Sequence, residues 1–328
     1  MKVIIPLAGM GKRLRPHTYS KAKPLVHLAG NTVLGHILDD LKDNKDVEEL
    51  IFITGYLGDQ IQEYVDSKYD FKTKYLEQKE LKGQAHAIQM AKDYVDDDDS
   101  VVVWFVDTIS DADISKLSEV EEDGAIYVKN IDDPRRFGQI KSDDNGIVKE
   151  IREKADPPVS DLVNIGIYYV KKAKSMFDAI DELIEKDIQT KGEYFLMDAF
   201  QIMIGKGAKF KSLEINVWKD CGKPDALLET NRYFLDNGKE KEIDAENSII
   251  IPPVHIEDGA KVKNSVVGPY VSIAEGTNVC CSILKDCIVG KESKIKDANL
   301  NESLVGDSAV VKGEKRKLNV GDSSEIDY

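Results

Sequence analysis

The amino-acid sequence predicts an α/β fold with a Rossmann-like, mixed and mostly parallel sheet, followed by a small left-handed parallel β-helix. In the first two thirds of the 328 residues, short apolar runs typical of buried strands alternate with apolar residues at helical spacing. Beyond residue 249, pairs of apolar residues recur every 16 or 17 residues, close to the roughly 18 residues of a coil built from three hexapeptides. We therefore expect an α/β domain over residues 1–236, a polar linker over 237–248, the β-helix over 249–314 and a polar tail over 315–328.

The first part of the chain has the pattern of consecutive βαβ units. Asn145-Gly146, the strongest short turn signal, predicts a hairpin between two strands within residues 137–151, and Pro224 opens a helix. In such sheets ligands bind beyond the carboxyl ends of the parallel strands. Further strands are expected at residues 3–7, 50–53 and 101–106, and helices at residues 33–41 and 84–95.

The repeat of the second part consists of four pairs of apolar residues, and the members of each pair lie six residues apart. Glycines at positions 259, 276, 290 and 306 recur with it. A β-sandwich of short strands would favour period-two alternation instead, so the repeat favours the β-helix. The pairs are Ile256 and Val262, Ile273 and Val279, Val289 and Ile295, and Val305 and Val311.

The composition argues against several classes of protein. A formal net charge of -15 would repel nucleic acid and an anionic membrane surface. The apolar run after Met1 is too short for a signal peptide, and no stretch approaches the ~20 apolar residues of a membrane span. The four cysteines have neither the density of a secreted scaffold nor a paired zinc spacing. We expect a soluble, cytoplasmic protein with free thiols.

A basic, glycine-containing loop follows the first expected strand. Residues 10–24 include five basic residues and no acid, although acids outnumber bases in the chain. Glycines let the backbone approach an anion closely, while amide hydrogens and basic side chains supply a positive field. The loop is neither a Walker loop nor a Rossmann dinucleotide fingerprint, and Gly-x-Gly alone is a weak signal. Expected nucleotide contacts in this loop are Leu7, Ala8, Gly9, Gly11 and Lys12.

The stretch from Gly9 to Leu41 resembles the signature of the sugar-nucleotide pyrophosphorylases, Gly-x-Gly-Thr-Arg-Leu-x-Pro-x-Thr followed by Lys-Pro and an amphipathic helix. The likeness covers nearly the whole first domain, and the β-helix resembles that of the long-form glucose-1-phosphate thymidylyltransferases. It implies the sheet of a nucleotide-diphospho-sugar transferase. It also implies that Arg13 and Lys23 form the catalytic basic pair, which holds the triphosphate and the sugar phosphate. Lys12 stands where the family has threonine, and it either contacts a phosphate or turns to solvent.

Further motifs correspond to the base and sugar subsites of that family. Gln78 and Gly83 resemble the residues that recognise the base, because an amide can pair with the imide edge of uracil or thymine. Both bases present that edge, so the motif does not separate UTP from dTTP. Without the resemblance, the neighbouring Glu and Lys of the sugar motif would be an ordinary surface pair. The resemblance assigns the sugar phosphate to Gly138, Glu153, Lys154, Asn164 and Glu193.

Two distant aspartates are the candidate metal ligands. Asp107 follows an apolar strand, and Asp220 follows a Val-Trp-Lys motif. The family uses these positions for Mg²⁺, a hard cation that prefers oxygen ligands. The chain departs from the family at Val106, which replaces glycine, and at Cys221, which replaces threonine. Capping of a turn would explain either aspartate alone, but it leaves the coincidence of both motifs unexplained.

The resemblance implies transfer of a nucleotidyl group from a nucleoside triphosphate to a sugar 1-phosphate, with magnesium-assisted, in-line release of pyrophosphate. dTTP and glucose 1-phosphate are the expected substrates, and uridylyl transfer to glucose and guanylyl transfer to mannose are the alternatives. A non-catalytic regulatory subunit is an alternative of another class, although this chain keeps both bases and both aspartates. We expect the β-helix to mediate homo-oligomerisation. Acyl transfer by the β-helix is a less favoured alternative, because four coils are few for that activity and the expected β-helix contains one histidine, His255.

Overall fold

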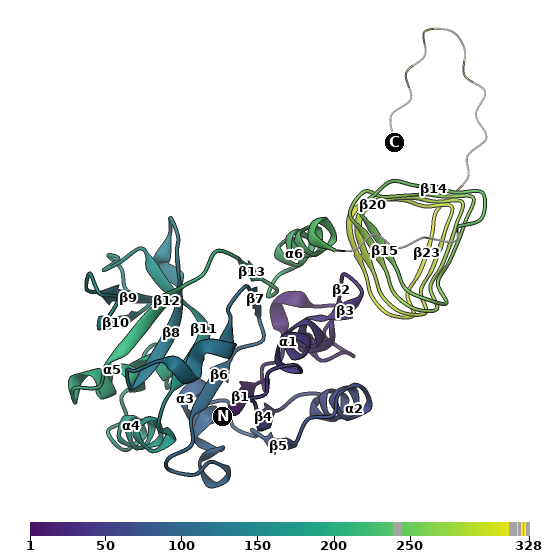
Figure 1. Cartoon of the computed structure of the whole chain (residues 1–328). Helices are drawn as coiled ribbons and strands as arrows, with labels where there is room; N and C mark the ends of the chain where they lie inside the picture. The colour runs from purple at the N-terminus through teal and green to yellow at the C-terminus, as the bar shows by residue number, and fades with distance from the viewer. Residues whose placement is uncertain (239–244, 315–319, 321–322, 324, 326–328) are drawn as a thin grey trace. The chain divides into compact units, whose positions relative to one another are not determined.

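Figure 1 shows the computed structural model of the chain, which describes residues 1–238 and 245–314 and the single residues Val320, Ser323 and Glu325. The chain divides into two compact units. The first unit consists of Met1–Val26 and Asn31–Leu227, and the second of His27–Gly30 and the chain from Leu228 onward. Within the expected linker and tail, residues 239–244 and most of 315–328 lie outside the described residues.

A nine-stranded mixed sheet forms the centre of the first unit. Its strands are β1 (Lys2–Pro6), β4 (Glu49–Thr54), β5 (Thr73–Glu77), β6 (Val101–Trp104), β8 (Gly124–Asn130), β9 (Gly138–Ser142), β10 (Val148–Glu153), β11 (Leu162–Val170) and β12 (Phe210–Glu214). β5, β4, β1 and β6 are parallel neighbours, and β12 is parallel to β8. β11 pairs antiparallel with β6, β8 and β9, and β10 pairs antiparallel with β9. Of the nine strands, β10 and β11 therefore run against the others, which confirms the expected mixed, mostly parallel sheet.

Helices cover this sheet because their apolar faces have the right spacing. In α1, for example, Val33, Ile37 and Leu41 are buried at intervals of four residues, and the side chain of Thr32 caps the first turn by accepting a hydrogen bond from the Gly35 amide at 2.9 Å. Side chains of α3, α4 and α5 join the strands in one core cluster. The helices of the chain are α1 (Val33–Leu41), α2 (Gly58–Lys68), α3 (Gln84–Gln89), α4 (Ala173–Glu185), α5 (Leu196–Gly205) and α6 (Pro224–Asn237).

Two expected elements are shorter in the structure. The helix expected at residues 84–95 ends at Gln89, because the next amides bond to the carbonyl three rather than four residues back and form a 3-10 turn at Lys92–Tyr94. The strand expected at residues 101–106 ends at Trp104. The chain then turns at residues 106–107 and enters the short strand β7 (Thr108–Ser110), which pairs with β13 (Trp218–Asp220).

The hairpin expected around Asn145-Gly146 is present. β9 and β10 pair antiparallel, and Gly146 supplies the positive φ of the turn at 72°. The Asp143 carboxylate fixes the turn by accepting hydrogen bonds from the Asn145 and Ile147 amides, each at 3.0 Å. The hairpin therefore forms where the local turn chemistry predicts it.

The second unit contains a parallel β-helix whose coils stack in register (Figure 1). One ladder aligns Ile256, Ile273, Val289 and Val305, and a second aligns Val262, Val279, Ile295 and Val311. The four apolar pairs of the sequence thus form two stacks in the core of the unit, which confirms the repeat. The strands are β14 (Ile249–Ile250), β15 (Val254–Ile256), β16 (Lys261–Lys263), β17 (Val266–Val267), β18 (Val271–Ile273), β19 (Asn278–Cys280), β20 (Ile283–Val289), β21 (Lys294–Lys296), β22 (Asn299–Val305) and β23 (Val310–Lys312).

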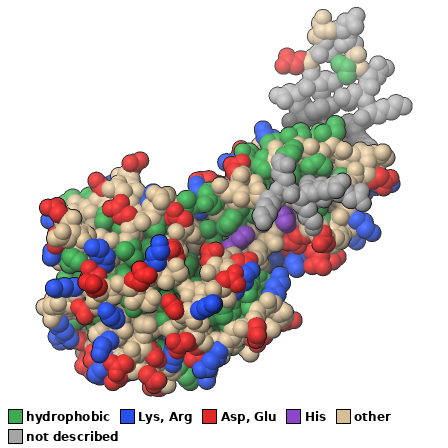
Figure 2. Space-filling model, in the orientation of Figure 1, with side chains coloured by type: hydrophobic (Ala, Val, Ile, Leu, Met, Phe, Trp, Pro, Cys, Tyr) green, Lys and Arg blue, Asp and Glu red, His purple; other side chains and the backbone are tan. Residues whose placement is uncertain are grey.

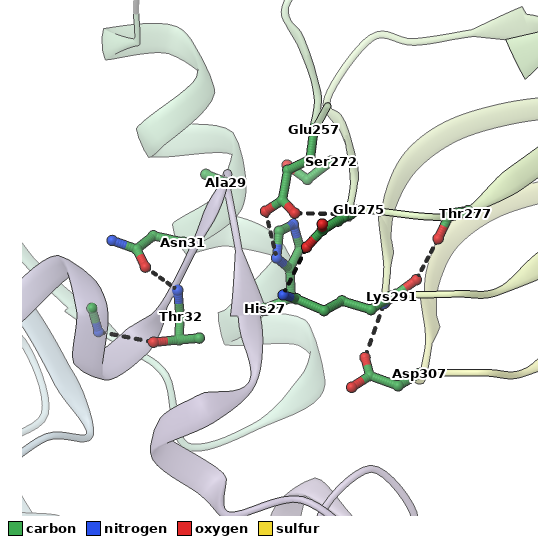
Figure 3. Close-up of polar contacts among 12 residues, drawn as sticks. His27, Ala29, Asn31, Thr32, Glu257, Ser272, Glu275, Thr277, Lys291 and Asp307 are labelled. Carbon is green, nitrogen blue, oxygen red and sulfur yellow. Dashed lines mark hydrogen bonds and ion pairs between the residues drawn. The ribbon is translucent and has the colours of Figure 1, made fainter. Parts of the chain in front are cut away.

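The segment His27–Gly30 belongs to this second unit, although it comes from the amino-terminal part of the sequence. It contains strand β2 (His27–Leu28) and is followed in the first unit by β3 (Asn31–Thr32). His27 Nδ1 lies 3.5 Å from a carboxylate oxygen of Glu257 (Figure 3). The Ala29 amide donates to the side chain of Asn231 at 3.1 Å. These partners are about two hundred positions away, so local sequence patterns do not reveal the assignment.

The surface carries charged side chains of both signs. On the face shown in Figure 2, acidic and basic side chains are interspersed over the molecule. In the part of the chain that the structure describes, every helix is too short or too polar to cross a bilayer.

Candidate active site

A cleft lies where the parallel strands of the first unit end. β1 leads into residues 7–9, β5 leads into Gln78, and β6 leads into residues 105–107, and all of these line one pocket, here called the first pocket. A second pocket shares Gln84, Phe105 and Asp107 with it. Ligands of α/β sheets bind at this edge, so the cleft is the candidate site.

The loop after β1 contains two glycines with different structural needs. Gly11 has φ +61°, and an added Cβ would lie 2.9 Å from the Cβ of Lys23, so both the backbone and the packing require glycine. An added Cβ on Gly9 would instead meet no atom within 4 Å. Because Gly9 lines the first pocket, the space beside it is open to a ligand.

Gln78 is a buried amide in the first pocket. Its Nε2 lies 3.2 Å from Nδ1 of His86. An amide nitrogen only donates hydrogen bonds, so Nδ1 accepts and the imidazole is neutral. Burial lowers the pKa of His86, which favours this neutral form. His86 thereby holds the Gln78 amide in one orientation.

Gly83 joins the start of α3 to the segment around Tyr194. Its φ is +113°, and an added Cβ would lie 2.6 Å from both the backbone nitrogen and the backbone oxygen of Tyr194. The Ala85 amide donates to the Tyr194 carbonyl at 2.9 Å, and the Tyr194 amide donates to the Lys82 carbonyl at 3.0 Å. These bonds place Glu193 in the first pocket, away from the other residues of the expected sugar site.

Lys23 and Arg13 come from two short 3-10 turns and stand beside the two aspartates. Nζ of Lys23 lies 3.6 Å from Oδ2 of Asp107. Arg13 lines the second pocket, and an added Cβ on Gly222 would lie 2.8 Å from both Nη2 of Arg13 and Oδ1 of Asp220. Each cation therefore stands near one of the two carboxylates.

The ribbon of β7 and β13 brings Asp107 and Asp220 together from positions more than a hundred residues apart. Asp220 pairs with Thr108, and the Cys221 amide donates to the Asp107 carbonyl at 2.8 Å. Both aspartates line the second pocket. Two carboxylates completed by substrate phosphates are the oxygen set that Mg²⁺ uses, so these residues fit that ion. The described residues hold no cluster of three or more metal-ligating side chains, so substrate oxygens would have to complete the coordination.

Several polar side chains line the second pocket. The Asn164 amide donates to the Gly138 carbonyl at 3.1 Å, and an added Cβ on Gly138 would lie 2.8 Å from a carboxylate oxygen of Glu153. Nζ of Lys154 lies 3.4 Å from that carboxylate and 4.1 Å from the ring centroid of Phe195. Burial raises the pKa of Glu153, and the Lys154 ammonium opposes this shift. A buried carboxylate of this kind can accept hydrogen bonds from the hydroxyl groups of a sugar.

The structure adds pocket residues that sequence reasoning did not identify. The hydroxyl of Tyr168 donates to the Asn164 side chain, and the ring of Trp218 packs edge-on against Phe137. The added residues come from separate elements, so no single motif contains them all. Two signals were available in the sequence: Arg136 precedes the Phe-Gly motif, and Trp218 lies within the Val-Trp-Lys motif. They are Phe105, Arg136, Tyr168, Phe195 and Trp218.

The structure gathers most of the expected site residues around this cleft. Gly11 and Lys12 line neither of the two pockets described here, and Lys12 is exposed. The first pocket includes Leu7, Ala8, Gly9, Lys23, Gln78, Gly83, Asp107 and Glu193. The second includes Arg13, Asp107, Gly138, Glu153, Lys154, Asn164 and Asp220.

Comparison with known proteins identifies the family. Residues 2–237 match the sequence profile of the nucleotidyl transferase family. The chain belongs to the sugar-1-phosphate nucleotidyltransferase family. It is 38% identical over 264 residues to the bifunctional protein GlmU of Methanocaldococcus jannaschii, a match that covers 79% of this chain and 61% of that protein. It is 30% identical over 332 residues to a glucose-1-phosphate thymidylyltransferase of Streptomyces griseus, covering 96% of this chain and 90% of the relative.

Solved structures of this nucleotidyltransferase family share the fold. A Bacillus anthracis protein assigned as a glucose-1-phosphate thymidylyltransferase superposes with a TM-score of 0.62 at 25% identity, over 74% of this chain and 98% of that one. A UDP-glucose pyrophosphorylase in complex with UDP-glucose superposes with a TM-score of 0.64 at 17% identity, over 72% and 99%. At 17% identity, the likeness to the UDP-glucose pyrophosphorylase shows a shared fold and no more.

Proposed function

We propose that this nucleotidyltransferase transfers the thymidylyl group of dTTP to glucose 1-phosphate and releases pyrophosphate. The proposal rests mainly on the cleft, in which an amide pocket and a carboxylate-lysine pocket meet at Asp107. The Streptomyces griseus thymidylyltransferase supports this substrate pair, because its match extends over 90% of its length. The match to the Methanocaldococcus jannaschii protein covers 61% of that protein, so its name carries less weight here.

The first pocket suits a pyrimidine with an imide edge. Gln78 offers an amide that can both donate and accept, and its orientation is held by His86. Gly9 leaves the space beside the loop open. A second candidate is uridylyl transfer to glucose 1-phosphate, because uracil presents the same edge as thymine.

To catalyse this reaction, the protein has to position the two substrates and stabilise negative charge in the transition state. The nucleophile is a phosphate oxygen of the sugar 1-phosphate, a dianion near neutral pH that needs no general base. It attacks the α-phosphorus in line, the bond from that phosphorus to the bridging oxygen breaks, and pyrophosphate leaves with the electron pair. Arg13 and Lys23 offset the negative charge that grows in the transition state. When bound by Asp107 and Asp220, Mg²⁺ would neutralise phosphate charge further.

A substrate screen tests the assignment. Pyrophosphate release is measured with four nucleoside triphosphates against the 1-phosphates of glucose, mannose, galactose and N-acetylglucosamine. We expect the highest kcat/KM for dTTP with glucose 1-phosphate. A maximum with UTP or with GTP and mannose 1-phosphate would replace the proposed pair with one of the alternatives. Release with no pair would favour the non-catalytic subunit.

Substitution of the aspartates tests the metal assignment. We expect Asp107→Asn and Asp220→Asn to lower kcat by orders of magnitude while the thermal unfolding midpoint stays near that of the wild type, because both carboxylates face the cleft. Glu63→Gln on the exposed surface of α2 is the matched control. Turnover within a few-fold of the wild type in both aspartate variants would refute the assignment.

A further inference from the structure

Cys280 and Cys281 are adjacent residues at a corner of the β-helix, at the end of β19. Their Sγ atoms lie 3.2 Å apart, and both side chains are half-buried, so solvent can reach the pair. Cys221 and Cys287, by contrast, are buried. The proposed nucleotidyl transfer uses neither residue of the pair, so its presence requires a separate explanation.

The stacked coils hold this corner in a fixed shape. Asn264 and Asp297 take the place of Cys281 in the coils before and after, and the three residues have φ values of 50°, 54° and 52° respectively. The Cys281 amide donates to the Lys263 carbonyl, and the Asp297 amide donates to the Cys280 carbonyl, each at 3.1 Å. Asn and Asp tolerate this left-handed backbone through local hydrogen bonds, an advantage that cysteine lacks. The β-helix therefore presents two thiols on a preformed frame at a corner where local preference favours other residues.

Charged neighbours surround the thiols. In the ladder of β16, β19 and β21, Cys280 lies between Lys263 and Lys296, both of which are exposed. Nearby ammonium groups favour thiolate ligands. The hydrogen bond shared with Cys281 raises the pKa of Cys280, so this thiol keeps its proton at neutral pH until a ligand displaces it.

The spacing of the sulfur atoms selects the kind of ligand. Two sulfur atoms 3.2 Å apart subtend an angle of about 90° at an atom bonded to each at about 2.3 Å, the length of a zinc–thiolate bond. This angle suits a three-coordinate ion that carries a lone pair, and it is smaller than the tetrahedral angle of a zinc site. Zinc would also need further ligands, and no cluster of three or more occurs among the described residues. We propose that Cys280 and Cys281 form a dithiol site that binds trivalent arsenic, with one arsenic atom bridging the two sulfur atoms.

The binding reaction balances without an oxidant. With phenylarsine oxide as the probe, both S–H bonds and the arsenic–oxygen bond break, two arsenic–sulfur bonds form, and the two thiol protons leave with the oxygen as one water molecule. Arsenic stays trivalent throughout. The product is a closed ring that contains the arsenic, both sulfur atoms and the backbone between the two residues.

Titration of the native, full-length protein with phenylarsine oxide tests the site. Mass spectrometry should show one phenylarsenic group per chain with loss of two hydrogens, and two thiols should become protected from alkylation. Cys281→Asn, which installs the corner residue of the preceding coil, should weaken binding by about a hundredfold because one of two attachment points is lost. Cys280→Lys, the residue of both neighbouring coils, should do the same. Cys287→Val, which removes a buried thiol, is the matched control and should bind like the wild type.

The same measurements can overturn the proposal. Equal binding by the wild type and Cys281→Asn would show that one thiol suffices and that no bridge forms. Adduct formation that requires denaturant would show that the folded corner does not present the pair. Because the readout is adduct mass and thiol protection, neither result depends on the substrates of the nucleotidyltransferase.

Discussion

Among the single residues around the cleft, Gly9 and Gly11 in the loop after β1 show how a packing requirement can be separated from an opening toward the pocket. The protein's own atoms fill the space beside Gly11 and leave the space beside Gly9 empty. The Gly-x-Gly motif alone does not distinguish the two glycines. The structure therefore shows that Gly11 is needed for packing and that Gly9 faces an open pocket.

The first prediction concerns these glycines. Gly9→Ala should fold with the stability of the wild type but raise KM for the triphosphate by about tenfold or more, because the methyl group displaces the ligand. Gly11→Ala should lower the free energy of unfolding by roughly 1–2 kcal/mol or more, because its left-handed backbone disfavours a side chain. Thermal unfolding and steady-state kinetics on both variants measure the difference. A Gly9→Ala protein that unfolds more readily than Gly11→Ala would contradict it.

The second prediction concerns the pH dependence of nucleotide binding. Burial holds the pKa of His86 below its ordinary value of about 6.5. As the pH falls through this lowered pKa, the ring gains a proton at Nδ1 and can no longer accept a hydrogen bond from Gln78. The affinity for the triphosphate should therefore decrease at acid pH. The same lowered pKa makes the unfolded chain bind the proton more readily, so His86 also reduces stability as the pH falls.

His86→Asn separates this effect from titration of the substrates. The asparagine oxygen still accepts a hydrogen bond but does not titrate in this range. KM for the triphosphate, measured from pH 5 to 8 in both proteins, should rise more steeply on acidification in the wild type. Parallel pH profiles would exclude His86 as the titrating group.

Among the elements, the loop around the second pocket depends on one buried side chain. The Gln139 amide donates to the carbonyls of Pro134 and Ala155 at 3.2 and 2.9 Å, and its oxygen accepts from the Val159 amide at 2.7 Å. These bonds connect the segment that carries Arg136 and the Phe-Gly motif to the loop between β10 and β11. A fully buried amide at the start of β9 thus shapes the pocket without lining it.

The third prediction tests this role of Gln139. Gln139→Leu should remove three hydrogen bonds to backbone groups, at a net cost of about 0.5–1.5 kcal/mol for each. KM for the sugar 1-phosphate should rise while KM for the triphosphate changes little, since the first pocket is built from other segments. Gln201→Leu serves as a comparison, because its oxygen accepts one backbone hydrogen bond, from Ile151. Equal effects on both KM values would contradict a local role.

Sequence patterns predicted the positions of the elements better than the residues at which they end. The hairpin at Asn145-Gly146 and helix α1 form where turn chemistry and apolar spacing predict them. β6 ends earlier than its apolar run, because the chain turns at residues 106–107 and enters β7, which pairs with β13. A partner strand contributed by a distant segment thus determines where this run of valines stops being a strand.

In the whole molecule, the β-helix carries an apolar face that points away from its core. Ile249, Val266 and Ile283 align on successive coils. Their neighbours Val267 and Leu284 are fully buried, whereas Ile249 and Ile283 are 62% and 49% exposed. An exposed ladder of β-branched residues favours contact with another protein surface. Homo-oligomerisation through the β-helix stays a prediction, and this ladder is the surface on which to test it.

The fourth prediction follows from that ladder. If it mediates assembly, the wild type should have a solution mass that is a multiple of one chain, and Ile283→Lys should reduce it to a single chain. Asn278→Lys, an exposed position on another face of the β-helix, is the matched control. Light scattering coupled to size-exclusion chromatography measures both. An oligomer that persists in Ile283→Lys would place the interface elsewhere.

The sequence by itself determined the features that depend on short-range chemistry. Alternating strand and helix patterns and the 16-to-17-residue repeat predicted both folds, because burial of regularly spaced apolar residues leaves few other arrangements. The motifs around Arg13, Lys23, Asp107 and Asp220 indicated the reaction class through a family resemblance. These features are local, or they repeat at a fixed interval, so they can be recognised without coordinates.

Tertiary structure alone decided which distant groups meet. The β7–β13 ribbon brings Asp107 to Asp220, and the bonds of Tyr194 move Glu193 into the first pocket. The assignment of His27–Gly30 to the second unit likewise depends on partners far away in sequence. The free energy of such contacts comes from pairing and packing between segments, which leave no periodic pattern in either segment alone.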